Sequence, residues 1–206
     1  MSQFFHLHPD NPQQRLLNQA VEIFRDGGVV VFPTDSGYAV GCLIGKKSAM
    51  DRIIQLRQIS QDHNFTLIVR DLSELATYAR LDNQGFRLLK NNTPGPYTFI
   101  LKGTKEVPRR LLNPKRKTIG IRVPEHTISL ALLEALGEPV MSTSLVLPGA
   151  DEAECDPEEI RFKLEHQVDL ILNGGYLMES PTTIVDMSDE TYEIVRLGTG
   201  DPSPFE

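Results

Sequence analysis

The sequence contains only two cysteines and no apolar run longer than a few residues. Cys42 and Cys155 lie far apart and show no C-x-x-C spacing, which argues against a disulfide framework or a zinc site, so each is expected to be a free thiol. A helix that spans a bilayer needs roughly 20 apolar residues, and the N-terminus has no basic stretch followed by an apolar one. We therefore expect a cytoplasmic protein with no membrane partner.

Common catalytic and nucleotide-binding motifs are also missing. The chain has no G-x-G-x-x-G, no G-x-x-x-x-G-K-[ST], no H-E-x-x-H and no G-x-S-x-G. His6 and His8 lie near the N-terminus, where a pair of histidines is more often exposed to solvent than bound to a metal. The sequence therefore predicts no metal site and offers no hydrolase nucleophile.

Positive charge is not in excess, because the net charge is −7. This balance argues against a protein whose whole surface binds nucleic acid. Locally, however, residues 105–117 (KEVPRRLLNPKRK) are basic, and residues 151–159 (DEAECDPEE) are acidic. Such runs usually form solvated faces, but the basic run also suits a phosphate backbone, so both interpretations stay open.

Segments typical of strands and helices alternate along most of the 206 residues. Helices are expected at 12–26, with Asn11 as the N-cap, and at 49–58, 73–79, 84–90, 126–136 and 158–165. Strands are expected at 4–7, 29–32, 38–43, 65–69, 97–102, 119–123, 140–143, 168–172, 183–187 and 192–196, the last two as a hairpin. This order predicts one α/β domain with a mixed, parallel and antiparallel sheet flanked by helices. The end of the chain, GTGDPSPFE, is expected to be mobile.

Small polar residues and arginines follow several of these strands. The buried strand 29–32 leads into Thr34, Asp35, Ser36 and Gly37, a sequence that suits an ordinary turn as well as a ligand site. Hydroxyl groups and arginines bind phosphate oxygens, so one anion-binding cleft at the strand ends is a second possibility. The other residues of this kind are Thr98, Arg122, Ser142, Thr143, Ser144, Thr182, Thr183 and Arg196.

The motifs and their order resemble those of the YrdC-like family. FPTDSGYAVGC at 32–42 is similar to the signature P-T-[DE]-[ST]-x-Y-G-L-G of that family, whose members resemble threonylcarbamoyl-adenylate synthases. PGPYT at 94–98, GIRVP at 120–124, STS at 142–144, PTTIVD at 181–186 and Arg196 with Gly198 are similar to its later motifs. The resemblance is strongest to the YciO branch. It spans residues 12–200 as one domain and leaves 1–11 as an N-terminal extension and 201–206 as a C-terminal tail.

The resemblance implies a twisted open sheet with a large, concave, positively charged cavity. Synthases of the family condense threonine, bicarbonate and ATP, so ATP with Mg²⁺ is implied as a substrate, and a partner protein moves the product to tRNA. Carried over to this chain, the catalytic positions are Arg57, Arg122 and Ser142. The positions that hold the amino acid, nucleotide and phosphates are Thr34, Asp35, Tyr38, Thr66, Ser144 and Arg196. Lys115, Arg116 and Lys117 are expected to form a rim that binds double-stranded RNA or tRNA.

Two departures from the family pattern bear on activity. Where the family has K-x-R, this chain has Arg57-Gln58-Ile59, and where it has S-A-N, the chain has Ser144-Leu145-Val146. His63 and Arg70 are candidates to replace the lost groups. The sequence thus predicts a nucleotide- or phosphate-binding and RNA-binding protein with weak or altered synthase activity. The alternatives are an adenylate-forming or carbamoyl-transferring enzyme with a different acceptor, and an RNA-binding module without catalysis.

Overall fold

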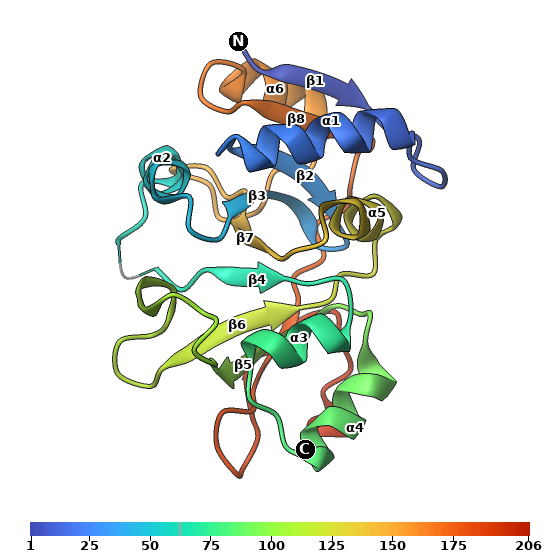
Figure 1. Ribbon diagram of the computed structural model, residues 1–206. Helices are drawn as coiled ribbons and strands as arrows, with labels where there is room; N and C mark the ends of the chain where they lie inside the picture. The colour runs from blue at the N-terminus through green and yellow to red at the C-terminus, as the bar shows by residue number, and fades with distance from the viewer. Residues whose placement is uncertain (62) are drawn as a thin grey trace.

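A computed structural model describes residues 1–61 and 63–206 of the chain (Figure 1). In this part of the chain the helices are α1 (Gln14–Arg25), α2 (Lys47–Arg57), α3 (Leu72–Tyr78), α4 (Asn83–Asn92), α5 (Thr127–Leu136) and α6 (Pro157–Leu164), with short 3₁₀ helices η1 (Arg109–Leu111) and η2 (Ser203–Phe205). The strands are β1 (Gln3–His6), β2 (Val30–Thr34), β3 (Gly37–Leu43), β4 (Thr66–Ile68), β5 (Tyr97–Lys102), β6 (Thr118–Arg122), β7 (Val140–Ser144), β8 (Leu170–Asn173), β9 (Thr183–Asp186) and β10 (Glu193–Arg196).

All of these strands join one open sheet in the order β1-β8-β2-β3-β7-β4-β6-β5-β9-β10. The sheet is mixed, with parallel pairs, such as β4 with β6, and antiparallel pairs, such as β3 with β7. The N-terminus lies beside β1 at one end of the sheet, and the C-terminus lies at the opposite end (Figure 1). The expected mixed α/β sheet in a single domain is therefore confirmed. No helix in residues 1–61 or 63–206 combines the length and the apolar composition needed to cross a membrane.

Side-chain alternation along the strands divides the core between the two faces of the sheet. Val30 and Phe32 of β2 pack in one apolar cluster with α1 and α5. Val29 and Val31 belong to a second cluster, to which α2, α3, α4 and α6 contribute. Both faces of the sheet are thus covered by helices around β2, which explains the continuous apolar run in its sequence.

The face that α1 and α5 cover around β2 carries smaller and more polar side chains farther along the sheet. Ile68 of β4 still belongs to the α1/α5 cluster, and Thr66, two residues earlier, shares its face. Thr66 pairs with Gly120 of β6 on one side and with Ser142 of β7 on the other. This polar part of the face forms the floor of the candidate site.

The expected helix start at Pro12 is wrong, because α1 begins at Gln14. Side-chain bonds hold the preceding residues in a turn instead. Nδ1 of His8 accepts hydrogen bonds from the backbone N–H groups of Asp10 and Asn11, and the His8 N–H donates to Oε1 of Gln13 at 3.0 Å. Asn11 is therefore part of a turn that precedes the helix.

Both ends of the chain are tied to the sheet. β1, within residues 1–11, pairs in parallel with β8. Near the other terminus, Phe205 is only 4% exposed, and its ring centroid lies 5.4 Å from that of Tyr97 and 5.7 Å from that of Phe99. The expectation of a mobile C-terminal end is wrong for this residue, because its aromatic ring belongs to the core.

Candidate functional site

The turn between β2 and β3 is shaped by Thr34 and Gly37. Oγ1 of Thr34 donates to the Gly37 carbonyl at 2.6 Å and accepts the Ser36 N–H at 3.1 Å. Gly37 has a φ of 104°, which favours glycine at this position. Thr34 is only 2% exposed, so its hydroxyl group is occupied in building the turn. The stretch therefore forms a turn, and its next two side chains, Asp35 and Ser36, contact an arginine.

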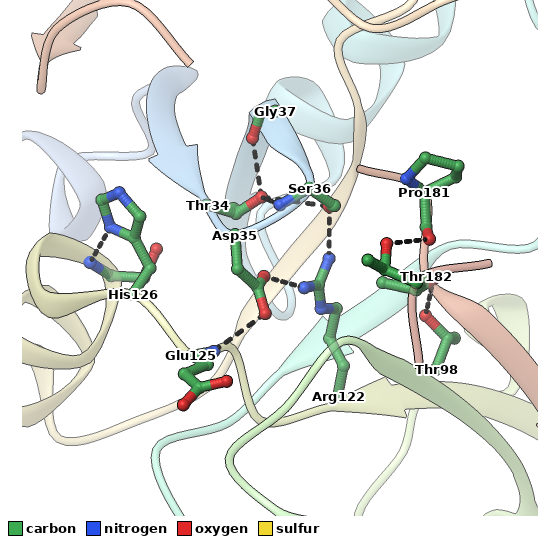
Figure 2. Close-up of polar contacts among 12 residues, drawn as sticks. Thr34, Asp35, Ser36, Gly37, Thr98, Arg122, Glu125, His126, Pro181 and Thr182 are labelled. Atoms are coloured by element: carbon green, nitrogen blue, oxygen red, sulfur yellow. Dashed lines mark hydrogen bonds and ion pairs between the residues drawn. The ribbon is translucent and has the colours of Figure 1, made fainter. Parts of the chain in front are cut away.

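Arg122, at the end of β6, is held by Asp35 and Ser36 (Figure 2). Its guanidinium forms an ion pair with the Asp35 carboxylate and donates to Oγ of Ser36 at 2.7 Å. The other carboxylate oxygen of Asp35 accepts the Glu125 N–H at 2.9 Å. The side chains of the pair are 8% and 11% exposed, and burial lowers the pKa of Arg122, which the Asp35 charge opposes. Nε of Arg122 has no hydrogen-bond partner in the described chain.

A cavity of about 350 Å³, here called the main cavity, opens beside this pair. Its basic side chains come from α2, from the segment that precedes β4, from β6 and from β10. Its polar floor comes from β4, β5 and β7. The residues that concern us in its lining are Ser36, Tyr38, Arg57, His63, Asn64, Thr66, Thr98, Arg122, Ser142, Thr143, Ser144, Val146, Asp151, Glu179, Thr182, Ile184 and Arg196.

Arg57, the last residue of α2, and His63 meet on one hydroxyl group at the wall of the main cavity. The Arg57 Nη1 donates to Oγ1 of Thr143, and the Arg57 Nε donates to the Val146 carbonyl at 2.9 Å. Nε2 of His63 lies 3.1 Å from the same Thr143 oxygen. Burial, followed by the neighbouring charge of Arg57, lowers the pKa of His63. His63, which sequence reasoning offered only as a substitute, is therefore part of the site.

Arg196, at the end of β10, forms another wall. Its Nη2 donates to the Thr182 carbonyl at 2.8 Å, and Oγ1 of Thr182 lies 2.8 Å from Oγ1 of Thr98 (Figure 2 shows the two threonines). Both acceptors that Arg196 contacts belong to Thr182 and are neutral. No carboxylate within the described residues forms an ion pair with Arg196, although Asp151 and Glu179 line the same cavity.

The remaining hydroxyl groups of the lining are partly engaged in the fold. Oγ of Ser142 donates to the Thr66 carbonyl at 3.2 Å. The Tyr38 hydroxyl donates to the Gly175 carbonyl at 2.7 Å and accepts the Gly174 N–H at 3.1 Å, and burial raises its pKa. Tyr38 thus fixes the segment that follows β8 beside the cavity.

The structure brings together most of the residues expected at the site. Thr34 and Asp35 do not line the main cavity but lie behind Ser36 and Arg122. The residues that do line it are Tyr38, Arg57, Thr66, Arg122, Ser142, Ser144 and Arg196. Sequence reasoning missed the carboxyl groups of Asp151 and Glu179, because acidic residues in loops have no local signal that they face a cavity.

The two residues expected to depart from the family pattern lie in different places. Val146 lines the main cavity with a branched apolar side chain. Ile59 instead packs against the apolar core. Arg70, the other candidate substitute, is not part of the cavity lining, and its guanidinium lies 3.7 Å from Asp71 and 3.8 Å from Glu134.

The basic segment 115–117 lies in the loop between η1 and β6. Arg116 is committed to the fold, because it contacts the Asp186 carboxylate, Oγ of Ser188 at 2.6 Å and Asp189 at 3.3 Å. Lys115 and Lys117 are exposed and form no ion pair within residues 1–61 and 63–206. Only these two lysines of the segment therefore present charge that is not already compensated.

Two further cavities adjoin the main one. The second cavity, of about 300 Å³, shares Asn64, Thr66, Thr98 and Ile184 with it and is otherwise lined mainly by apolar residues such as Phe65 and Ile100. The third cavity, of about 250 Å³, shares His63 and Asn64 with the main cavity. Within the described residues, no three His, Cys, Asp or Glu side chains gather as a metal-binding group.

An open α/β sheet with arginines and hydroxyl groups around one cavity defines a domain suited to anionic ligands. The chain belongs to the Sua5–YciO–YrdC family, whose sequence pattern, described as telomere recombination, matches residues 22–198. Among its relatives is YciO of Escherichia coli K12, which is 67% identical over the full length of both chains, and whose crystal structure gives a TM-score of 0.95.

More distant relatives connect the chain to synthases. The threonylcarbamoyl-AMP synthase of Vibrio vulnificus YJ016 is 30% identical over 162 residues, which are 77% of this chain and 86% of that protein. The crystal structure of P. abyssi Sua5 complexed with L-threonine is 22% identical, with a TM-score of 0.86 over 95% of this chain and 57% of that one. This last likeness shows a shared fold.

Proposed function

We propose that the main cavity binds a nucleoside triphosphate, expected to be ATP with Mg²⁺, beside an amino acid. The observation that carries the proposal is that Arg57 and Arg196 line one cavity and donate only to neutral oxygen atoms there. A guanidinium bound to carbonyl and hydroxyl groups keeps its full charge, so both groups attract phosphate oxygens. The ion would arrive with the nucleotide as part of the substrate.

The relationship to threonylcarbamoyl-AMP synthases supports a specific reaction. In that reaction an oxygen of the threonine carbamate attacks the α-phosphorus of ATP, and the bond to pyrophosphate breaks. The site must hold two anions together and must stabilise negative charge on the leaving pyrophosphate. Positioned guanidinium groups serve both purposes without a covalent nucleophile.

We propose further that this chain catalyses the reaction slowly or on a different acceptor. Val146 places an apolar side chain in the lining where the family pattern has an asparagine. Ile59 stands where the family pattern has an arginine, and its side chain packs against the apolar core. The loss of one preorganised donor costs about 2–4 kcal/mol of transition-state stabilisation, which is roughly 30- to 1,000-fold in rate. We expect the imidazole of His63, whose Nε2 lies 3.1 Å from Oγ1 of Thr143 beside Arg57, to offset part of this loss.

The test is an assay of pyrophosphate release with purified protein, Mg²⁺, bicarbonate, labelled ATP and single amino acids. Slow release with threonine is expected, and Val146→Asn is expected to accelerate it. Arg57→Gln and Arg196→Gln are expected to weaken ATP binding by about tenfold each, whereas Arg87→Gln, at an exposed position of α4, should not change it. Turnover at the rate of a full synthase would refute the slow reaction, and the absence of ATP binding would refute the site. Faster release with another amino acid would identify the different acceptor.

RNA binding is a second candidate function, favoured by the loop that carries Lys115 and Lys117. Oδ1 of Asn113 accepts the Lys115 N–H at 3.1 Å and the Arg116 N–H at 2.9 Å, so the loop backbone is held in one conformation. A fixed pair of lysines suits the phosphates of double-stranded RNA or tRNA, to which a partner protein would transfer the product. Filter binding to duplex RNA is expected to weaken with salt and in Lys115→Gln/Lys117→Gln. Affinity that is independent of salt would rule out this contact.

A further inference from the structure

The third cavity lies between α2 and η1. Met50 and Ile54 of α2, with Leu111 and Leu112 of the η1 region, give it an apolar wall. The other lining residues are Gln61, His63, Asn64, Arg109, Arg110 and Pro114.

Two arginines of the basic segment 105–117 line this cavity. The Nη2 of Arg110 lies 3.3 Å from Oδ1 of Asp51, and the two side chains are 41% and 51% exposed, so the pair is weak and open to exchange. Arg109 forms no ion pair in residues 1–61 and 63–206. Arg116 differs, because Asp186 and Asp189 already hold it. The positive charge that remains available in segment 105–117 thus includes Arg109 and Arg110 at the third cavity, as well as the lysines of the loop between η1 and β6.

The third cavity and the main cavity share His63 and Asn64, which belong to both linings. His63 also shares Oγ1 of Thr143 with Arg57. A phosphate bound beside Arg57 therefore lies at the junction of the two cavities. His63 thus faces both the cavity that Arg57 lines and the cavity that Arg109 and Arg110 line.

We propose that the third cavity is a phosphate-binding compartment, which receives phosphate groups of a ligand whose remainder occupies the main cavity. The proposal rests on the function proposed above and adds to it Arg109 and Arg110, which the family motifs do not include. The recognised chemistry is that of phosphate oxygens, which guanidinium groups bind through paired hydrogen bonds. Two sources supply it, the terminal phosphates of a free nucleoside triphosphate and the backbone phosphates of an RNA strand.

The experiment compares Arg109→Gln/Arg110→Gln with a control, Arg87→Gln/Lys90→Gln, which removes two positive charges from the exposed surface of α4. The probes are AMP, ATP, inorganic triphosphate and a short single-stranded RNA, with dissociation constants measured by calorimetry or filter binding. If free nucleotide is the source, the cavity variant is expected to bind ATP and inorganic triphosphate about five- to twentyfold more weakly and AMP within twofold of wild type. If RNA is the source of the phosphates, the cavity variant is expected to bind only the RNA probe more weakly than wild type does. The control variant is expected to bind all four probes as wild type does.

Two results would overturn the compartment. One is that all probes bind the cavity variant within twofold of wild type. The other is that the control variant loses as much affinity, because the effect would then be long-range charge alone. If wild type binds neither AMP nor ATP, the proposed function fails. The affinities of wild type and the cavity variant for inorganic triphosphate and RNA then still test whether the third cavity binds phosphate. Thermal unfolding of both variants within about 2 °C of wild type excludes a folding defect, since only exposed side chains are changed.

Discussion

Substitution of Asp35 by asparagine tests the buried ion pair beside the main cavity. The change keeps the size and shape of the side chain but removes its charge, so Arg122 becomes a buried cation without a counter-ion. Both side chains of the pair are about nine-tenths buried. Breaking such a pair by removing one partner costs about 3–5 kcal/mol, because the desolvated charge remains.

The expected loss lies near the lower end of that range. An asparagine oxygen still accepts one of the two hydrogen bonds that Asp35 receives, from Arg122 or from the Glu125 N–H. A loss of about 3 kcal/mol corresponds to a fall in Tm of roughly 6–12 °C for a chain of this length. Scanning calorimetry and urea denaturation measure the two quantities independently.

Two variants serve as controls for this prediction. Asp51→Asn breaks the exposed pair with Arg110 and is expected to change Tm by less than about 2 °C. The double variant Asp35→Asn/Arg122→Met removes the buried charge together with its partner, so it is expected to be more stable than Asp35→Asn alone. A fall of less than 2 °C for Asp35→Asn, or additive losses in the double variant, would show that the pair does not work as described.

Three other predictions concern the same molecule. Acidification from pH 7.5 to 5.5 is expected to destabilise the folded protein. Burial holds the pKa values of His63 and His126 below the usual 6.5, and the charge of Arg57 adds to this effect at His63, so the unfolded chain binds protons that the folded chain does not. The Tm of a His63→Gln/His126→Asn variant should fall less over this pH range, and a fall equal to that of wild type would contradict the prediction. Phe205→Ala is expected to cost about 3–5 kcal/mol in urea denaturation, and a cost below 1 kcal/mol would mean that the C-terminal end is not anchored. Gly198→Ala places a Cβ against the Pro181 carbonyl, so it is expected to displace the wall beside Arg196 and to weaken ATP binding; unchanged affinity by calorimetry would count against that wall.

The secondary structure was predictable where the information is local. The expected strand at 97–102 matches β5, and the expected helix at 126–136 differs from α5 only in the N-cap residue, His126. Apolar periodicity and flanking proline or glycine define such elements. The start of α1 was not predictable in this way, because the bond between His8 and Gln13 competes with the helical pattern of Pro12.

Most of the expected site residues line the main cavity, but the electrostatics of the cavity were not predictable from the sequence. The contact between Arg122 and Asp35 joins residues 87 positions apart, and that between Arg116 and Asp186 joins residues 70 positions apart. No local pattern reveals such pairs. The same holds for His63, whose contact with Thr143 spans 80 positions. Motif positions therefore identified which residues gather, while the tertiary fold decides which of their charges remain available.

This distinction changes the roles of the basic residues. Arg122 and Arg116 resemble ligand-binding cations in sequence, but each has a carboxylate partner, so most of its field is cancelled before a ligand arrives. Arg57 and Arg196 contact carbonyl and hydroxyl oxygens, which orient the guanidinium without cancelling its charge. An incoming phosphate gains the full attraction of these two groups, whereas at Arg122 it must compete with Asp35. The strongest attraction for phosphate is therefore expected between Arg57 and Arg196, and Arg122, whose side chain is buried beside Asp35, is expected to contribute less.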